Sequence, residues 1–274
     1  MQKVSLIMTT YNSKENFSKS IESAVSQDYP CIEIIVVDGG STDGTLDVIK
    51  SYALKLADNN EEHARNGSQE QAISLKWISE PDKGIYDGMN KGIGLSTGDI
   101  IAVFNDLFTS THAISDMVSA IDKDGSDGSY ADLAYMDGEI CRRFWKMDRG
   151  SINSGWMLAH PTMYLKREVY DEYGEYDLSY HSSSDYEFML RILKDEKVHL
   201  SYVPEVIIEM FYGGTSNNGL SGYPRNIHEA YLALKANGIS FPMIVIALRI
   251  MRTLNQYRRA SAYTESRKDA YKEK

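Results

Sequence analysis

Several features of other protein classes are missing from this sequence of 274 residues. It has only two cysteines, Cys31 and Cys141, which lie far apart without the spacing of metal ligands, so we expect reduced thiols in a cytoplasmic protein. No apolar run approaches the roughly 20 residues that span a bilayer. The first residues, MQKVSLIMTTYN, lead straight into a strand pattern without a cleavage site, and we therefore expect no signal peptide.

Two common phosphate-binding motifs are also missing. The chain contains no GxGxxG, which argues against the usual dinucleotide-binding fold, and no GxxxxGK[ST], which excludes a P-loop. Positive charge is scarce, because 29 Lys and Arg stand against 39 Asp and Glu, a net charge of −10. A protein this acidic lacks the phosphate-neutralising cations of a general nucleic-acid binder. The exception begins at Arg249, after which basic residues outnumber acidic ones.

Strand and helix patterns alternate through the first hundred residues. Strands are predicted at 4–9, 32–37, 75–79 and 99–104, where the residues are apolar and often β-branched. Apolar residues at helical spacing lie between these runs. This alternation predicts a parallel, doubly wound sheet. The polar segment 58–71 is typical of a solvated loop or an insertion.

Beyond residue 110 the alternation is less regular. Four more strands are expected, at 132–136, 162–166, 198–203 and 206–211, with a helix from Tyr186 to Lys194. This part of the chain predicts a mixed extension of the same sheet. No linker rich in Gly, Pro or Ser separates domains. We therefore expect one α/β domain over 1–220, with halves 1–108 and 109–220, and a helical basic extension over 221–274.

Polar residues follow each of the first four predicted strands. The segments are TTYN (9–12), DGGSTDGT (38–45), EPDKGIYDGMNKG (80–92) and NDLF (105–108). Ligands of open α/β sheets bind beyond the carboxyl ends of the strands, so these segments should line one cleft. The residues expected there are Thr10, Tyr11, Asp38, Asp82 and Asp106.

Two aspartates of the second segment have different explanations. Asp38 ends an apolar strand, where a carboxylate is costly unless a partner satisfies it. A nucleobase imide or a ribose hydroxyl would be such a partner. Asp43 is equally well explained as a turn or helix N-cap residue.

The polar segments occur in the order of a known family. VSLIMTTYN, IIVVDGGSTDGT, SEPDKGIYDGMNKGI and SSSDYEFMLRI together resemble the inverting family-2 glycosyltransferases, above all bacterial enzymes that build surface polysaccharides such as colanic acid. The match covers roughly residues 3–216. It implies a single GT-A, Rossmann-like domain with a mixed central sheet and a helical C-terminal appendage. It also implies transfer of a sugar from a nucleotide-diphosphate donor, with UDP expected, to a saccharide or lipid-linked saccharide.

The resemblance assigns the donor to the cleft described above. The base and ribose would contact Thr10, Tyr11 and Asp38. The ribose and diphosphate would lie near Asp82, Lys83, Asn90 and Lys91. In YGGTSN (212–217), Ser216 would close over the phosphates, although an ordinary turn explains this segment equally well. The family's common Arg before the Asn is Met89 here, so any cation must come from Lys83 or Lys91.

The family's metal-binding motif is shortened in this chain. Members usually have Asn-Ser-Asp-Asp or a close variant, whereas this sequence has only Asn105 and Asp106. Mn²⁺ or Mg²⁺ commonly takes one or two protein carboxylates, with phosphates and waters as its other ligands. We therefore expect Asp106 to bind the metal. The departure leaves open a non-catalytic binder of nucleotide sugars. A sugar-phosphate nucleotidyltransferase is disfavoured, because TTYNSKEN is not its Gly-rich basic loop.

The acceptor side of the resemblance supplies a catalytic base. An inverting transfer needs a carboxylate to take the proton of the acceptor hydroxyl, and the match assigns this role to Asp185. Without the match, a first-turn aspartate favoured by the helix dipole would explain it. Trp156 and His160 would flank the acceptor sugar, and His160 can also be a structural hydrogen-bonding residue. We expect Arg191 to pair with an acid near the same helix rather than to contact the substrate.

The stretch 241–260 predicts an amphipathic helix. Its apolar face carries Ile244, Ala247, Leu248, Met251 and Leu254, and arginines lie away from that face. The helix could dock on its own domain or on a second subunit. It could equally lie on anionic lipid at the inner face of the membrane, which would fit a lipid-linked acceptor.

Overall fold

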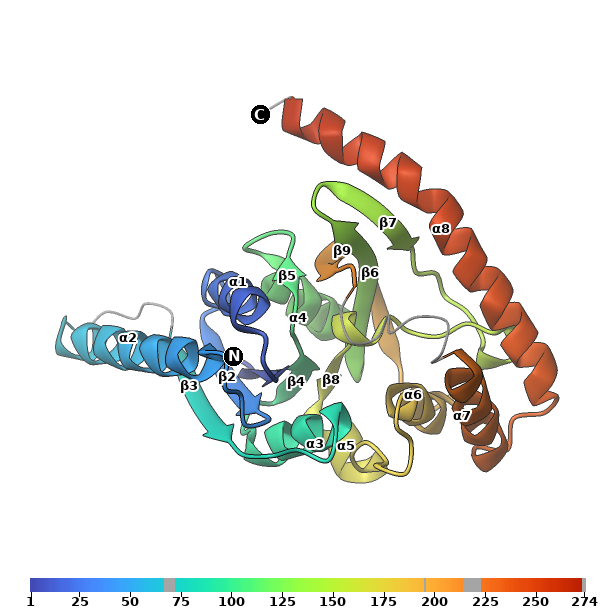
Figure 1. Cartoon of the computed structure of the whole chain (residues 1–274), viewed down its shortest axis with the longest axis horizontal. Coiled ribbons are helices and arrows are strands. Elements are labelled where there is room, and N and C mark those ends of the chain that lie inside the picture. The colour runs from blue at the N-terminus through green and yellow to red at the C-terminus, as the bar shows by residue number, and fades with distance from the viewer. Residues whose placement is uncertain (67–71, 195, 214–222, 273–274) are drawn as a thin grey trace.

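A computed structural model describes residues 1–66, 72–194, 196–213 and 223–272. A nine-stranded mixed sheet forms its centre, in the order β3-β2-β1-β4-β8-β6-β9-β5 with β7 paired to β6. Helices cover this sheet, and Figure 1 shows α2 and α8 at opposite ends of the view. The α/β class with a mixed sheet and a helical C-terminal segment, expected from the sequence, is confirmed.

The N-terminal part of the sheet is parallel, as predicted. Its strands are β1 (Val4–Thr10), β2 (Cys31–Asp38), β3 (Ala72–Ser79) and β4 (Ile100–Val103). Helices α1 (Lys14–Val25), α2 (Thr45–Asn66) and α3 (Ile85–Leu95) connect them. Strands buried on both faces need apolar, β-branched residues throughout, and the fully buried run Ile34–Val37 is of this kind. The carboxyl ends of these strands therefore meet at one edge.

The remaining strands extend this sheet in mixed directions. They are β5 (Leu107–Phe108), β6 (Gly128–Asp137), β7 (Ile140–Trp145), β8 (Tyr164–Lys166) and β9 (Leu200–Phe211). β8 pairs antiparallel with β4 and β6, whereas β9 runs parallel to β6. Between them lie α4 (Ala113–Asp124), η1 (Ile152–Ser154), η2 (His160–Thr162), α5 (Arg167–Tyr173) and α6 (Ser184–Leu193). One apolar core runs beneath both parts of the sheet.

Three local features differ from the sequence prediction. The expected loop at 58–66 is helical and continues α2, because a helix surrounded by solvent tolerates polar residues on most of its faces; 67–71 lie outside the described residues. The two strands expected on either side of Pro204 form the single strand β9, and the register shift there accommodates the proline. The β7 strand was not expected, since charged residues interrupt its apolar pattern.

The C-terminal helices α7 (Tyr223–Ala236) and α8 (Pro242–Lys272) pack against the acceptor-side half. α8 runs along the outer edge of the molecule past β7 (Figure 1). Gly155, at φ +71°, allows a close approach, since a Cβ there would lie 2.4 Å from the Arg249 backbone nitrogen. The expected boundary at 220 falls outside the described residues. None of the described helices combines the length and the apolar composition needed to cross a membrane.

α8 docks on its own domain through the face opposite to the predicted one. Val245, Ile246 and Ala260 are buried, whereas Ile244, Met251 and Leu254 are each more than half exposed. The docked face also carries polar contacts, including the Thr264 hydroxyl, which accepts the Cys141 backbone N–H at 3.0 Å. The apolar stripe expected from the sequence therefore faces outward.

Candidate active site

Thr10 and Asp38 lie side by side at the carboxyl ends of β1 and β2, and Ser79 follows in register on β3. Asp38 is fully buried. Its carboxylate accepts the Ser79 hydroxyl at 2.6 Å and the Ser41 backbone N–H at 3.0 Å, and it also accepts the Ser41 hydroxyl. Side chains of the protein therefore satisfy the charge that we expected a nucleoside to satisfy. The Thr10 hydroxyl, in contrast, is buried and has no hydrogen-bond partner among the described residues.

Tyr11 and Asp82 meet over the glycine that follows Asp38. A Cβ added to Gly39 would lie 3.3 Å from both the Tyr11 ring and Asp82 Oδ2, and one added to Gly88 would lie 3.1 Å from Asp82 Oδ2. Tyr11 is 66% exposed. Glycine at these positions therefore lets an exposed ring and a carboxylate converge at the strand edge, as predicted. A planar base can lie against such an exposed ring.

The two lysines beside this edge of the sheet, Lys91 and Lys83, differ in how far nearby carboxylates neutralise their charge. Lys91 Nζ lies 2.7 Å from Asp82, 2.9 Å from Glu80 and 3.5 Å from Asp87, and these partners, Asp82 foremost, raise the pKa of Lys91. Three carboxylates therefore neutralise Lys91 already. Lys83 contacts the same group through its backbone N–H, which donates to Asp87 at 3.0 Å.

Asn90 has a structural contact. Its amide nitrogen donates to the Tyr176 carbonyl at 2.8 Å, and its amide oxygen accepts the Tyr176 N–H at 3.0 Å. Both ends of the amide are thus bound to the segment between α5 and α6. Asn90 ties α3 to the acceptor-side half of the protein.

Asp106 follows β4 and is 7% exposed. Its Oδ1 accepts the Phe211 backbone N–H at 3.2 Å, and no ion pair to Asp106 is found among the described residues. Burial raises the pKa of Asp106 to about 7, against the smaller effect of the Phe211 hydrogen bond. Asn105 does not join it, because the Asn105 amide bonds the Thr9 backbone N–H at 2.8 Å and the Thr9 hydroxyl at 3.0 Å.

Asp185 stands in the first turn of α6 and is half-buried. Its Oδ1 accepts the Tyr86 hydroxyl at 2.9 Å. Burial and then Asp185 itself raise the pKa of Tyr86 well above its usual value, so Tyr86 remains a donor at neutral pH. One carboxylate oxygen is held in place, while Oδ2 has no hydrogen bond within the described part of the chain.

Tyr135 of β6 connects the two acids. Burial foremost raises its pKa, and the charges of Asp106 and Asp185 raise it further, against the effect of Arg143. Both carboxylates therefore act on the same phenol, although they come from opposite halves of the chain. That the two acids face one site stays a prediction.

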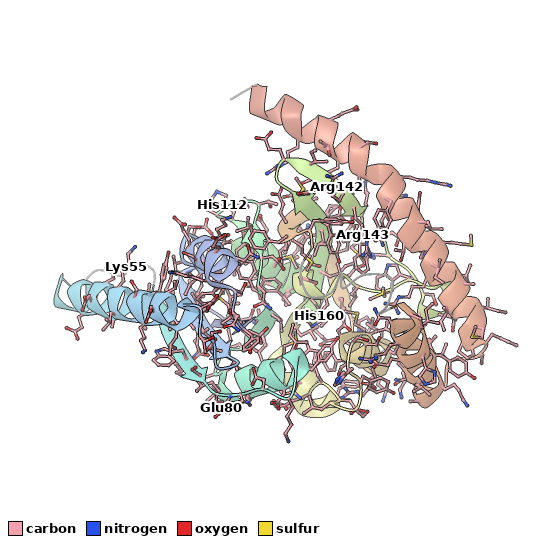
Figure 2. The ribbon with its side chains drawn as sticks, in the orientation of Figure 1. Lys55, Glu80, His112, Arg142, Arg143 and His160 are labelled. Atoms are coloured by element: carbon pink, nitrogen blue, oxygen red, sulfur yellow. The ribbon has the colours of Figure 1, made fainter. Side chains whose placement is uncertain are left out.

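The predicted acceptor-side residues Trp156 and His160 are both buried. His160 is buried near the middle of the molecule (Figure 2), and its Nε2 lies 2.7 Å from the Tyr176 hydroxyl. Burial lowers the pKa of His160, while Asp185 acts in the opposite direction. Trp156 packs in the core and donates to the Asp148 carbonyl at 2.8 Å. Both side chains are thus held by the protein itself. Ser216 lies outside the described residues.

Arg191 pairs with an acid of its own helix, as predicted. Its guanidinium lies 2.8 Å from Glu187, one turn earlier on α6.

A family profile and several known proteins match this chain. The profile described as Glycosyl transferase family 2 matches residues 5–174, which is more than half of the chain. The chain belongs to glycosyl transferase family 2.

Relatives of this family-2 glycosyltransferase match it over different lengths, from about a third of the chain to nearly all of it. The "PGL/p-HBAD biosynthesis glycosyltransferase" of Mycobacterium tuberculosis (strain ATCC 25177 / H37Ra) is 24% identical over 93% of this chain and 97% of its own. The "Putative glycosyltransferase EpsE" of Bacillus subtilis (strain 168) is 37% identical, over 34% of each chain.

Solved glycosyltransferases share its fold. The mannosyltransferase PcManGT of Pyrobaculum calidifontis, in complex with GDP-Man and Mn²⁺, has a TM-score of 0.63 and 19% identity, covering 97% of this chain and 75% of its own. TarS 1–349 of S. aureus, in complex with UDP-GlcNAc, has a TM-score of 0.59 and 15% identity, covering 96% and 92%. Together with the family match, these likenesses confirm the GT-A fold expected from the sequence.

The carboxylate of Asp106 fits a divalent cation that is held by a single protein carboxylate. Asp106 Oδ2 has no hydrogen bond in the described part of the chain, and the buried carboxylate has no counter-charge there. A cation would supply that charge. No group of three or more His, Cys, Asp or Glu able to hold a metal occurs among the residues that the structure describes. The other ligands would therefore be phosphates and waters.

Sequence reasoning missed two tyrosines of this site. Tyr86 lies within the third polar segment and Tyr135 within a predicted strand, and neither was predicted as a site residue. The available signal was weak, since a tyrosine between Ile85 and Asp87 fits a helix face equally well. Their roles depend on which acids they meet across the fold.

Proposed function

We propose that this family-2 glycosyltransferase transfers a sugar with inversion from a UDP-linked donor to a saccharide or lipid-linked saccharide, in the synthesis of a bacterial surface polysaccharide. The observation that carries the proposal is the placement of Asp185, whose Oδ1 is held by the Tyr86 hydroxyl at 2.9 Å while its Oδ2 has no hydrogen bond within the described part of the chain. The printed names of relatives support it as well, since TarS was solved with UDP-GlcNAc and the mycobacterial relative is named for PGL/p-HBAD biosynthesis.

In the proposed reaction Asp185 is the general base. Its Oδ2 would take the proton of the acceptor hydroxyl as that oxygen attacks the anomeric carbon, and the nucleoside diphosphate would leave from the opposite side. Tyr86 keeps the other oxygen, Oδ1, in place through a bond of 2.9 Å. Asp106 would hold Mn²⁺ or Mg²⁺, which when bound offsets the charge on the departing diphosphate.

The donor would lie along the ends of β1 to β3. In this proposal Thr10, Tyr11 and Asp38 line the base and ribose. Asp82, Lys83, Asn90 and Lys91 line the ribose and diphosphate. Because Lys91 and Asn90 are already bound to other groups, we propose that they shape this subsite while Lys83 supplies the accessible charge. The residues from 109 to 220, including His160, Trp156 and Ser216, would serve the acceptor and the closing loop.

Donor turnover and nucleotide binding test this function separately. The full-length protein should bind UDP with Mn²⁺ and release UDP from a UDP-sugar. Asp185→Asn should keep UDP affinity while turnover falls by orders of magnitude, because the base is lost and the fold is kept. Asp171→Asn, an exposed acid of α5, is the matched control and should leave both unchanged. Near-normal turnover in Asp185→Asn would exclude the assigned base, and donor binding without turnover in the native protein would favour the non-catalytic binder.

We further propose that α8 holds this enzyme on the inner face of the membrane. Met243, Ile244, Met251 and Leu254 are each 58–63% exposed and share one side of the helix. Arg258 and Arg259 are exposed one turn further along, on a protein that is otherwise acidic. An apolar stripe with arginines beside it matches anionic lipid better than a second copy of this acidic chain.

Vesicle sedimentation tests this contact. The full-length protein should sediment with phosphatidylcholine vesicles that contain a quarter phosphatidylglycerol. Met251→Asp/Leu254→Asp should lose most of this binding. Ser261→Asp/Ala262→Asp adds the same charge to exposed positions of the same helix without removing the apolar stripe, and should bind nearly as the native protein does. Equal partition of both variants, or a stable dimer in ultracentrifugation that only the first variant breaks, would refute the lipid contact.

A further inference from the structure

Arg143 on β7 lies among aromatic rings beside the proposed active site. Its guanidinium carbon is 4.8 Å from the ring centroid of Tyr135, its partner in the β6–β7 register, and 4.9 Å from that of Trp145. Tyr257 of α8 lies on another side at 6.0 Å. Arg143 Nε donates to Gln256 Oε1 at 2.5 Å. Two rings and one hydrogen bond therefore fix this guanidinium in place.

The charge of Arg143 is not paired within the described part of the chain. Arg142 on the same strand pairs with Asp137 at 2.7 Å, and Arg267 and Arg252 of α8 pair with Glu209 and Asp148. No ion pair is found for Arg143 there, and its two terminal nitrogens have no hydrogen-bond acceptor among the described residues. Arg143 is ordered and partly buried, and it has no acidic partner in the described part of the chain, although the sequence contains 39 acidic residues. Such an arginine can bind an anion from outside the protein.

Arg143 also lies against Tyr135, whose pKa is raised in part by the charges of the two site acids. The Tyr135 phenol is the group on which Asp106, Asp185 and Arg143 all act. Gln256 and Tyr257, which approach Arg143, belong to the helix that carries the exposed apolar stripe. Figure 2 shows Arg143 beside β7 on the α8 side of the molecule, away from Glu80 at the end of β3. The arginine therefore lies on the acceptor side rather than at the strand ends proposed for the nucleoside.

We propose that Arg143, held between Tyr135 and Trp145, binds a phosphate group of the acceptor. The planar fork of a guanidinium matches two oxygens of a phosphate, and a stacked arginine loses little conformational freedom on binding. A phosphate-bearing saccharide carrier bound there would bring its sugar hydroxyl towards Asp185. This inference rests on the proposed function and adds the chemical class of the acceptor.

Binding of methyl phosphate, a minimal phosphate monoester, tests the subsite. We would titrate it into the full-length protein saturated with UDP and Mg²⁺, at constant ionic strength, and follow tryptophan fluorescence because Trp145 lies against the guanidinium. Binding should be saturable, about 10- to 100-fold weaker in Arg143→Gln, and intermediate in Arg143→Lys, which keeps the charge without the fork. Arg142→Gln is the matched control on the same strand and should bind as the native protein does.

Each other outcome has a distinct meaning. If Arg143→Gln and Arg142→Gln bind methyl phosphate equally, the inference is wrong while UDP binding still supports the proposed function. If Arg143→Gln and Arg143→Lys weaken UDP tenfold, and methyl phosphate competes with UDP, the arginine serves the donor diphosphate and the acceptor assignment falls. If the native protein fails to bind UDP, the proposed function fails, and this inference fails with it.

Discussion

Replacing Asp106 by asparagine should stabilise the metal-free protein, by an amount that depends on pH. Burial raises the pKa of Asp106 from 3.8 to about 7, and one backbone N–H at 3.2 Å offsets only part of that effect. The unfolded chain ionises this group near its ordinary pKa, whereas the folded chain holds the proton until about pH 7. Stability is therefore lost as the pH rises through this interval. An asparagine keeps the acceptor for Phe211 and carries no charge.

The size of this effect follows from the shift. Each unit of pKa difference corresponds to about 1.4 kcal/mol. The free energy of unfolding of Asp106→Asn, relative to the native protein, should therefore rise by about 1.4 kcal/mol per pH unit between pH 5 and 7. Above pH 7 the carboxyl is ionised in both states, so the difference should level off at up to about 4 kcal/mol. Below pH 4 it is protonated in both states, and the charge contributes nothing.

Urea unfolding at pH 5, 6, 7 and 8 in the presence of a chelator measures this difference. Glu33→Gln is the control of opposite sign: burial raises the pKa of Glu33, but bonds from Lys76, Thr97 and Ser5 outweigh burial and hold it at about 2. Above pH 5 the Glu33 carboxylate is ionised in both the folded and the unfolded state. Glu33→Gln should therefore be less stable than the native protein by an amount that does not change with pH. A pH-independent difference for Asp106→Asn would refute an uncompensated buried charge. Added Mn²⁺ should stabilise the native protein, more at pH 8 than at pH 6 because protons compete, but not Asp106→Asn.

Two further substitutions test other contacts. Tyr86→Phe removes the hydroxyl that holds Asp185, so kcat should fall roughly tenfold with UDP affinity unchanged, and a native kcat in steady-state kinetics would rule out positioning by Tyr86. Gly155→Ala places a Cβ 2.4 Å from the α8 backbone and should cost more than about 2 kcal/mol and expose the α8 arginines to trypsin. Gly138→Ala, with φ +58° and open space around it, should cost only about 1 kcal/mol and leave α8 protected; equal losses would show that α8 does not depend on close approach at Gly155.

The nucleoside side of the site could be predicted because it depends on local order. Parallel strands end at one edge, so residues after successive strands become neighbours whatever the packing elsewhere. Thr10 and Asp38 are direct register partners for this reason. The protein partners of Asp38 were not predicted: Ser41 and Ser79 donate hydrogen bonds to its carboxylate. Ser41 lies three positions after Asp38 and Ser79 lies on the next strand, so both are close to Asp38 in space. The sequence alone does not show whether these serines or a ligand would bind the Asp38 carboxylate.

The acid–tyrosine contacts could not be predicted, because they depend on packing between distant segments. Tyr86 and Asp185 lie 99 positions apart in the sequence, and only the fold brings α3 close enough to the first turn of α6 for them to meet. Similarly, the burial of Asp106 depends on the end of β9, where Phe211 contacts it. Motif spacing predicts where a strand ends. The solvent exposure of the side chain at that strand end depends on which other segments of the fold cover it.

The orientation of α8 shows a second limit of sequence patterns. Ile244, Met251 and Leu254 give the clearest apolar periodicity, but the docked face contains Gln256 and Arg252, whose side chains bond Arg143 and the Ser154 carbonyl. In α8, the face that docks through these polar contacts is less apolar than the face that remains exposed to solvent. The hydrophobic pattern therefore identified a helix face correctly but did not decide between the neighbours considered for it.

The two acids of the site have opposite environments, and each environment fits a different task. Asp185 is half-buried and held by Tyr86, with one oxygen free, as a base needs when it must be ionised and must reach an incoming hydroxyl. Asp106 is buried without a counter-charge, so ionisation costs free energy until a cation arrives. A single carboxylate in such a place should bind metal weakly on its own and more tightly together with other anionic ligands. Metal affinity should therefore depend on the donor diphosphate, and the shortened motif would couple the two binding events.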